Sequence, residues 1–427
     1  MDTLIIGFAL FSLFFGAGNL IFPPLLGLDY GTRWPIASLG FILTGVGLAS
    51  IAVYSMAKKG GDIIEFTKIG GKNLSTAVSF IISLTLGPLG AIPRTGATSG
   101  EVMISSGIKI NYILFILIFF SLSYVFVIRE NKIIDVIGKY LTPLLLIVLF
   151  IMIIIGIINP IGPAMTTQDT NIDVFSNSIL EGYNTMDAMA AIAFAPIIIQ
   201  SIRKNNDEDR VLKQTLKVIL IATTGLVIVY MALTYLGASS SKFVSNEISR
   251  VELLIFIANS LLGSYGKFIL ALMIVLACFT TSIGLISSIA AMLYRTFNQK
   301  ISYLVLASII TVVSIILSLV GVDTIVKLTS PLLTFIYPIV LVMVVFNLLD
   351  HDIDPLINKL SFLIIGAIAV LGTIVDYANI ISPQSSLLIE NIYNKMPLSK
   401  QGLPWLIPFI ILLIIQWILY TMKVREA

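Results

Sequence analysis

Two clusters of helix-breaking and polar residues interrupt apolar stretches of this chain. The first cluster consists of Gly16, Ala17, Gly18 and Asn19, followed by Pro23 and Pro24. Glycine weakens a helix, and proline lacks the amide hydrogen that a helix interior needs. Lipid offers no replacement partners, so such a break persists only where the freed backbone groups meet an ion, a ligand or another helix. The first cluster therefore predicts an unwound binding site for a charged ligand.

The second cluster lies near the middle of the chain. It consists of Tyr183, Asn184, Thr185, Met186 and Asp187. Polar side chains at membrane depth are too costly to face acyl chains, so we expect them to point into the protein. A half-helix that begins after each break directs its amide groups and positive dipole end into the gap. We expect the amides around Gly16, Ala17 and Gly18 to hold a carboxylate, and the free carbonyls to suit a sodium ion.

Adjacent threonines in a later apolar stretch provide oxygen ligands for a cation. Thr280 and Thr281 could offer two hydroxyls to an ion that also meets the carbonyls of Ser12 and Phe15. Neutral oxygens suit a monovalent ion, whereas a divalent ion prefers carboxylates. A structural role is the alternative, because threonines in membrane helices commonly bond the carbonyl four residues back.

Arg94 is the strongest isolated charge in the sequence. It lies in a stretch rich in glycine and proline, at a depth where its charge needs a partner. That partner is either an acid or a set of backbone carbonyls, and Asp187 and Glu101 are the candidate acids. We favour a gating or structural ion pair over direct contact of Arg94 with a substrate.

The composition indicates that membrane-embedded segments must position these residues. Of 427 residues, 57% are hydrophobic and only 11% are charged, and the mean hydropathy is +1.02. A soluble protein needs roughly 25% charged residues, so lipid must be the main solvent. The single cysteine, Cys278, excludes an intrachain disulfide, and the single histidine, His351, excludes a clustered histidine metal site. The start of the chain lacks a basic region and a cleavage site, and we expect no removable signal peptide.

A spanning helix needs about 20 apolar residues, and this rule predicts an all-α polytopic membrane protein of about twelve transmembrane helices. The segments lie near 3–26, 35–57, 76–100, 111–128, 137–158, 178–200, 214–237, 262–293, 302–320, 324–348, 360–380 and 403–422. The third, sixth and eighth are rich in small and polar residues and should form the bundle core. The fourth, fifth, ninth and twelfth are nearly pure aliphatic and aromatic and should face lipid.

Lysine and arginine residues concentrate in alternate loops. Lys58 and Lys59 follow the second segment, and Arg129, Lys132 and Lys139 follow the fourth. Cytoplasmic loops carry the excess of these residues. We therefore expect the protein to lie in a bacterial inner membrane, with the even-numbered loops and both termini on the cytoplasmic side.

The two breaks fall in the first helix of each of two five-helix sets. Because five is odd, the second set enters the membrane from the opposite side, which makes an inverted repeat. We expect the first repeat in residues 1–158, the second in 159–350 and two further helices in 351–427.

These segments resemble the branched-chain amino acid:cation symporter family, the bacterial system II carriers. The run from Phe14 to Pro24 is similar to the first-helix signature of that family nearly residue for residue. Other marks are Ala91-Ile92-Pro93-Arg94-Thr95, Gly182-Tyr183 with Thr185-Met186-Asp187-Ala188, and Ala277-Cys278 with Thr280-Thr281. This sequence departs from the family at Asn184, where an apolar residue is expected, and at Gly96, where alanine is more usual.

The resemblance implies a LeuT-type inverted repeat of five plus five helices with two C-terminal helices. It implies import of leucine, isoleucine and valine by sodium symport. The implied sodium ligands are the carbonyls of Ser12, Phe15 and Ala277 with the hydroxyls of Thr280 and Thr281. Asn19 matches a position that lines the substrate or a second ion. Asn184 could alter the selectivity for side chains or add a polar contact.

Three other functions stay open at this stage. A proton-coupled carrier on the same fold would carry its proton on Asp187, Glu181 or Glu101. A non-transporting amino-acid sensor would keep the binding site without transport. A membrane enzyme is disfavoured, because zinc-protease, phosphate-loop and serine–histidine motifs are lacking. We expect no cofactor beyond a co-transported sodium ion, and no nucleic-acid partner; the substrate is a small amino acid, and the oligomeric state is open.

Overall fold

The computed structural model describes residues 2–128, 142–204, 207–245, 247–349, 353–381 and 387–426. These residues form helices and no strand. The helices are α1 (Asp2–Phe14), α2 (Ala17–Tyr30), α3 (Trp34–Ile42), α4 (Ala49–Lys58), α5 (Ile63–Thr67), α6 (Lys72–Leu86), α7 (Ala91–Ser105), α8 (Tyr112–Ile128), α10 (Thr142–Ile158), α11 (Asn171–Tyr183), α12 (Asp187–Arg203), α13 (Glu208–Ser240), α14 (Arg250–Thr296), α15 (Tyr303–Ser318), α16 (Val322–Leu348), α17 (Pro355–Ile381), α18 (Leu387–Tyr393) and α19 (Leu406–Glu426). The start of the fifth predicted segment, with Arg129, Lys132, Lys139 and also His351, lies outside the described residues.

Length and composition make this a multi-pass membrane protein. Among the described residues, seven helical stretches are long and apolar enough to cross a membrane, and five shorter apolar helices accompany them. The long stretches are Ala17–Lys58, Lys72–Ser105, Asn171–Arg203, Asp209–Ser240, Arg250–Thr296, Val322–Leu348 and Pro355–Ile381.

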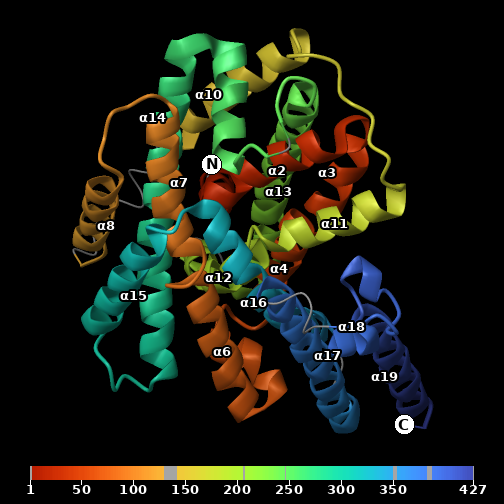
Figure 1. The fold of residues 1–427 in the computed structure, drawn as a ribbon. Coiled ribbons are helices and arrows are strands. Elements are labelled where there is room, and N and C mark those ends of the chain that lie inside the picture. The colour runs from red at the N-terminus through yellow and green to blue at the C-terminus, as the bar shows by residue number, and fades with distance from the viewer. Residues whose placement is uncertain are drawn as a thin grey trace.

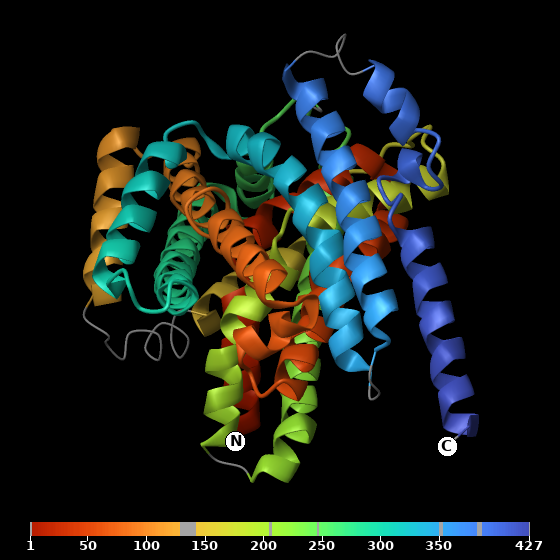
Figure 2. The ribbon, with the colours of Figure 1, turned by 90° about the horizontal axis from the view of Figure 1, so that it is seen from below.

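The helices separate into a buried centre and an apolar shell. Every residue of α7 from Ala91 to Gly100 is buried, as the small residues of this stretch predict. By contrast, α8 exposes a row of large aliphatic side chains that includes Ile113, Leu114 and Leu117. Large contiguous apolar surfaces mark a lipid or protein contact. Figures 1 and 2 show α8 and α15 on one side of the molecule and α17 and α19 on the other.

Helices α2 and α13 approach each other backbone to backbone. A Cβ atom on Gly27 would collide with the carbonyl of Thr234, and one on Gly237 would collide with the carbonyl of Pro24. Small residues allow membrane helices to approach backbone to backbone. The contact holds α2, the helix after the first break, against the 33-residue helix α13.

Two predicted segments differ from the structure. The third, predicted as one helix over 76–100, consists of α6 and α7 with a non-helical turn from Gly87 to Gly90. Pro88 has no amide hydrogen to donate there. The eighth begins at Arg250 rather than near 262, and Gly263 kinks it with φ 68° and ψ −172°. The apolar run that precedes the kink is packed into the protein, since Leu253, Leu254 and Ile257 are fully buried.

Candidate functional site

The first predicted break is present between α1 and α2. Helix α1 ends at Phe14 and α2 begins at Ala17. The amide of Gly16 donates to the carbonyl of Phe14 over 2.8 Å, a contact too short in sequence for an α-helix. No side chain in the described chain caps the start of α2. The first amides of a helix lack partners within it, so this end can receive an anion.

The second predicted break is also present, between α11 and α12. Helix α11 ends at Tyr183, and α12 begins at Asp187. Met186 has a left-handed backbone with φ 65°. A non-glycine residue in this region is uncommon, and such conformations cluster at functional sites.

A small inner pocket lies where the two breaks meet α7 and α14. It is lined by Leu13, Phe14, Gly16, Ala17, Gly18, Asn19, Leu86, Ala91, Arg94, Thr95, Thr185, Met186, Asp187, Ala190, Phe194, Thr281 and Leu285. Its free volume is about 30 Å³, which is room for about two water molecules. Charged, amide and hydroxyl groups form part of the wall, and aliphatic and aromatic side chains form the rest.

Arg94 connects α7 to the second break. Its Nη1 and Nη2 atoms donate to the carbonyls of Asn184, at 2.5 Å, and Thr185, at 3.2 Å. Within the described residues it forms no ion pair with either predicted acid, and two of its nitrogens donate instead to these unwound carbonyls. Its side chain also touches the first break, where a Cβ on Gly18 would lie 2.8 Å from Nη2.

Asp187 lies in a polar cluster made by three helices. Asn19 of α2 donates to Oδ2 of Asp187 at 2.6 Å, and the hydroxyl of Tyr230 on α13 donates to the same oxygen at 3.4 Å. Asn19 also donates to the Tyr230 hydroxyl. All three side chains are buried.

The two threonines on α14 have different surroundings. Both hydroxyls donate to the carbonyl of Ala277, over 2.7 Å from Thr280 and 3.1 Å from Thr281. Only Thr281 lines the inner pocket. A Cβ on Gly16 would lie 3.4 Å from its Oγ1 atom, so Thr281 faces the first break.

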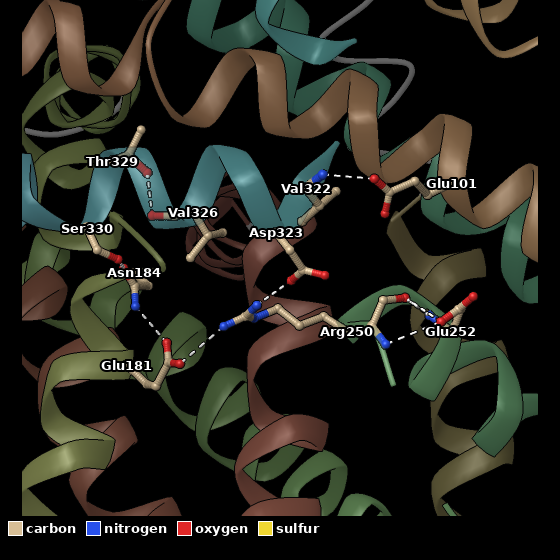
Figure 3. A network of polar contacts seen from close by, with 11 residues as sticks. Glu101, Glu181, Asn184, Arg250, Glu252, Val322, Asp323, Val326, Thr329 and Ser330 are labelled. Atoms are coloured by element: carbon tan, nitrogen blue, oxygen red, sulfur yellow. Dashed lines mark hydrogen bonds and ion pairs between the residues drawn. The ribbon is translucent and has the colours of Figure 1, made fainter. Parts of the chain in front are cut away.

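A larger outer cavity lies beside the second break, between α11, α14, α16 and α17. Its volume is about 580 Å³, and it is lined by Leu180, Glu181, Tyr183, Asn184, Arg250, Asp323, Val326, Lys327, Ser330, Pro331, Leu333, Thr334, Asp376, Asn379 and Ile380. In Figure 3 Arg250 reaches between two acids, Glu181 at 3.5 Å and Asp323. We call Glu181, Arg250 and Asp323 the outer ion network.

The outer ion network continues into the second break. Asn184 donates to Glu181 at 2.7 Å and accepts from Ser330 at 2.7 Å (Figure 3). The ring of Phe22 on α2 lies close to both arginines. Its centroid is 5.3 Å from Cζ of Arg94 and 5.5 Å from Cζ of Arg250.

Sequence comparison identifies the family. The family model described as branched-chain amino acid transport protein matches residues 1–423. The branched-chain amino acid permease BraB of Bacillus subtilis is 33% identical, over 98% of this chain and 95% of that protein. The chain belongs to the family of branched-chain amino acid transport proteins. Another member of this family, a candidate branched-chain amino acid carrier of Staphylococcus saprophyticus, is 35% identical over 100% of this chain and 98% of its own.

Solved structures show that this branched-chain transport protein has the LeuT-type fold. Mhp1, a nucleobase-cation-symport-1 family transporter, aligns with a TM-score of 0.60 at 14% identity, over 94% of this chain and 96% of its own. MhsT, solved in complex with L-phenylalanine, aligns with a TM-score of 0.53 at 16% identity, over 87% of this chain and 97% of its own. Family and fold are those of membrane transporters and not of enzymes.

The predicted site residues of this family member divide between the two spaces. The inner pocket is lined by Gly16, Ala17, Gly18, Asn19, Arg94, Thr185, Met186, Asp187 and Thr281. The outer cavity is lined by Tyr183 and Asn184. The lining of the inner pocket does not include Ser12, Phe15, Ala277, Thr280 or Glu101. Glu101 instead accepts from the amide of Val322 at 2.8 Å, at the start of α16 (Figure 3).

The structure shows the local contacts of Asn184 and Gly96, the two positions at which the resemblance led us to expect a different residue. Asn184 bridges Glu181 and Ser330 in the outer cavity and does not line the inner pocket. Gly96 leaves room for the ring of Phe120, which a Cβ would strike. Asn184 therefore serves to hydrogen-bond neighbouring side chains, and Gly96 serves to make room for one.

Sequence reasoning missed Tyr230 and Arg250. Tyr230 lies 211 residues from Asn19, in a helix whose sequence shows no polar motif. Arg250 lies between the predicted segments 214–237 and 262–293. The Ser249–Glu252 capping box at the start of α14 was the available signal for a helix there.

Proposed function

We propose that this chain imports leucine, isoleucine and valine together with sodium. The observation that carries the proposal is the two-sided inner pocket, which combines helix-end amides, Arg94, Asp187 and Thr281 with an aliphatic wall. A branched-chain amino acid has the same division, with two charged groups on one carbon and an aliphatic chain opposite. The names of the relatives agree with this substrate class.

The free amides at the start of α2 are the proposed site for the substrate carboxylate. Backbone amides and the positive end of a helix stabilise an anion where water is excluded. The aliphatic chain would then face Met186, Phe194 and Leu285. Burying an isobutyl group there contributes about 1.5–3 kcal/mol by the hydrophobic effect, which favours leucine over glycine or serine.

Sodium is proposed to bind between the first break and Thr281. The hydroxyl of Thr281 faces Gly16, and the carbonyls of Ser12, Phe15 and Ala277 complete the expected set. Neutral oxygens of this kind suit a monovalent cation. The resemblance also implies the inverted repeat of five plus five helices and the twelve crossings. The matched breaks between α1 and α2 and between α11 and α12 support the inverted repeat.

The pocket must widen before an amino acid can enter. Met186 and Gly90 mark one place where the wall can move, because a Cβ on Gly90 would lie 2.8 Å from Cε of Met186. Methionine is unbranched and repacks readily. The outer ion network joins α11, α14 and α16, and we propose that its opening and closing controls the outer path during alternating access.

Uptake into proteoliposomes tests the proposal. Radiolabelled leucine should accumulate under an inward sodium gradient with pH equal on both sides, and unlabelled isoleucine and valine should compete. Undiminished uptake in sodium-free buffer under a proton gradient would favour proton coupling. Sodium-dependent leucine binding without any accumulation would favour a sensor.

A further inference from the structure

Asp187 is a buried acid whose charge has no ionic partner within 4.0 Å in the described residues. Its side chain is 3% exposed and lines the inner pocket. The two donors that reach its Oδ2 atom, Asn19 and Tyr230, are neutral. A charge taken out of water is costly unless an opposite charge compensates it. Within the described part of the chain, no cation therefore contacts this carboxylate directly.

Helix capping does not explain the orientation of the Asp187 side chain, although Asp187 is the first residue of α12. A helix-capping acid would accept from the first amides of its own helix, but at this end it is the hydroxyl of Thr185 that accepts from the amide of Asp187, at 3.3 Å. The carboxylate of Asp187 instead turns toward α2 and α13, where Asn19 and Tyr230 hold it. Two neutral donors that fix one oxygen leave acceptor sites for a further donor, because an ionised carboxylate offers about four.

The nearest built-in cation is already engaged elsewhere. Arg94 lines the same pocket but donates to the carbonyls of Asn184 and Thr185. The proposed sodium site lies at Thr281, beside Gly16. Neither group is therefore assigned to the open acceptor sites of Asp187.

We propose that Asp187 receives the α-ammonium group of the substrate, and that Asn19 and Tyr230 are positioning residues that aim its carboxylate. An ammonium group brings three N–H donors and a full positive charge, which match the acceptor and the charge that the cluster lacks. The substrate carboxylate lies on the amides of Gly16 to Gly18, which immediately precede Asn19 in the chain. The inference rests on the proposed function and adds the residue that selects α-amino acids over simple carboxylic acids.

A thermodynamic cycle tests this contact, with the full-length purified protein at fixed sodium. Binding of leucine and of 4-methylpentanoate, which is leucine without its amino group, is measured for the wild type and for Asp187→Asn. Removing either charge should weaken binding by about 30-fold or more, as for other buried charge pairs. Removing both should cost little more than removing one, because neighbouring groups are coupled. Losses that simply multiply would overturn the inference.

The control is Asp173→Asn, the same chemical change at an exposed residue in the first turn of α11. It should leave the ratio of leucine to 4-methylpentanoate affinity unchanged. A raised sodium requirement in Asp187→Asn with no coupling to the ammonium group would make Asp187 a sodium ligand and overturn the inference.

The wild type alone keeps the inference testable if Asp187→Asn does not fold. Wild-type protein that binds 4-methylpentanoate as tightly as leucine would overturn it, whereas a loss of about 30-fold or more supports it. Absence of leucine binding to the wild type would instead refute the proposed function, so the two failures are distinguishable.

Discussion

At the scale of single residues, Thr280 and Thr281 show how surroundings separate two identical side chains. Both hydroxyls donate to the carbonyl of Ala277, so hydrogen bonding alone does not distinguish them. Thr281 lines the inner pocket and faces Gly16, whereas Thr280 does not line that pocket. An oxygen can bind an ion only where the ion can reach it.

Thr281→Ala should raise the sodium concentration for half-maximal leucine uptake by about tenfold, the effect of losing one polar contact to a charge. Thr280→Ala should change it less, because Thr280 does not line the inner pocket. Leucine uptake against sodium in proteoliposomes measures both. Equal effects of the two substitutions would contradict the assignment of Thr281 to the ion site.

Residue types predicted part of the site correctly. Glycine, asparagine and aspartate inside apolar stretches indicated the lining residues from Gly16 to Asn19 and Asp187, because such residues are costly in lipid. Tyr230 could not be predicted, since a tyrosine in an apolar helix is unremarkable until the fold brings it to Asn19. The sequence also could not predict that Asn184 lines the outer cavity and not the inner pocket, because this depends on the turn after Tyr183.

At the scale of helices, the backbone contact of α2 with α13 sets the position of the first break. Gly237 lies against the carbonyl of Pro24 with no room for a side chain. The amides that the proposed function assigns to the substrate carboxylate belong to the helix that this contact holds.

Gly237→Ala should therefore lower the thermal stability of the purified protein, because inserting a methyl group into a tight contact costs about 1–3 kcal/mol. Gly366→Ala on α17 is the matched control, since a Cβ there meets no atom within 4 Å. Size-exclusion chromatography after heating measures both midpoints. An unchanged midpoint for Gly237→Ala would contradict the close approach of the two helices.

The breaks in the first and sixth predicted segments were foreseen, whereas the break between α6 and α7 was not. Gly87 and Pro88 gave a signal as clear as that of Gly16 and Gly18. The average hydropathy of the segment concealed it, because a short turn barely lowers the apolar content of a long window. Helix boundaries are the least reliable part of such predictions.

At the scale of the whole molecule, the charge pattern of the loops predicts the orientation in the membrane. Lys242 lies in the loop after α13, which we expect outside, and Lys300 lies between α14 and α15, which we expect inside. Both side chains are exposed.

Cysteine labelling in cells tests this orientation, in a Cys278→Ala background that removes the only native thiol. A membrane-impermeant maleimide should label Lys242→Cys in intact cells and Lys300→Cys only after permeabilisation. The background variant alone should stay unlabelled. The opposite pattern would show that the molecule is inverted.

The unequal sizes of the two spaces determine how tightly a substrate is held. An inner pocket of about 30 Å³ admits a bare ion but no branched side chain, whereas the outer cavity of about 580 Å³ holds a whole amino acid. If the substrate binds only to molecules whose inner pocket has widened, its apparent dissociation constant is the intrinsic one divided by the fraction of molecules in that state. Any change that holds the pocket open without removing a substrate contact thus tightens binding while making no new contact.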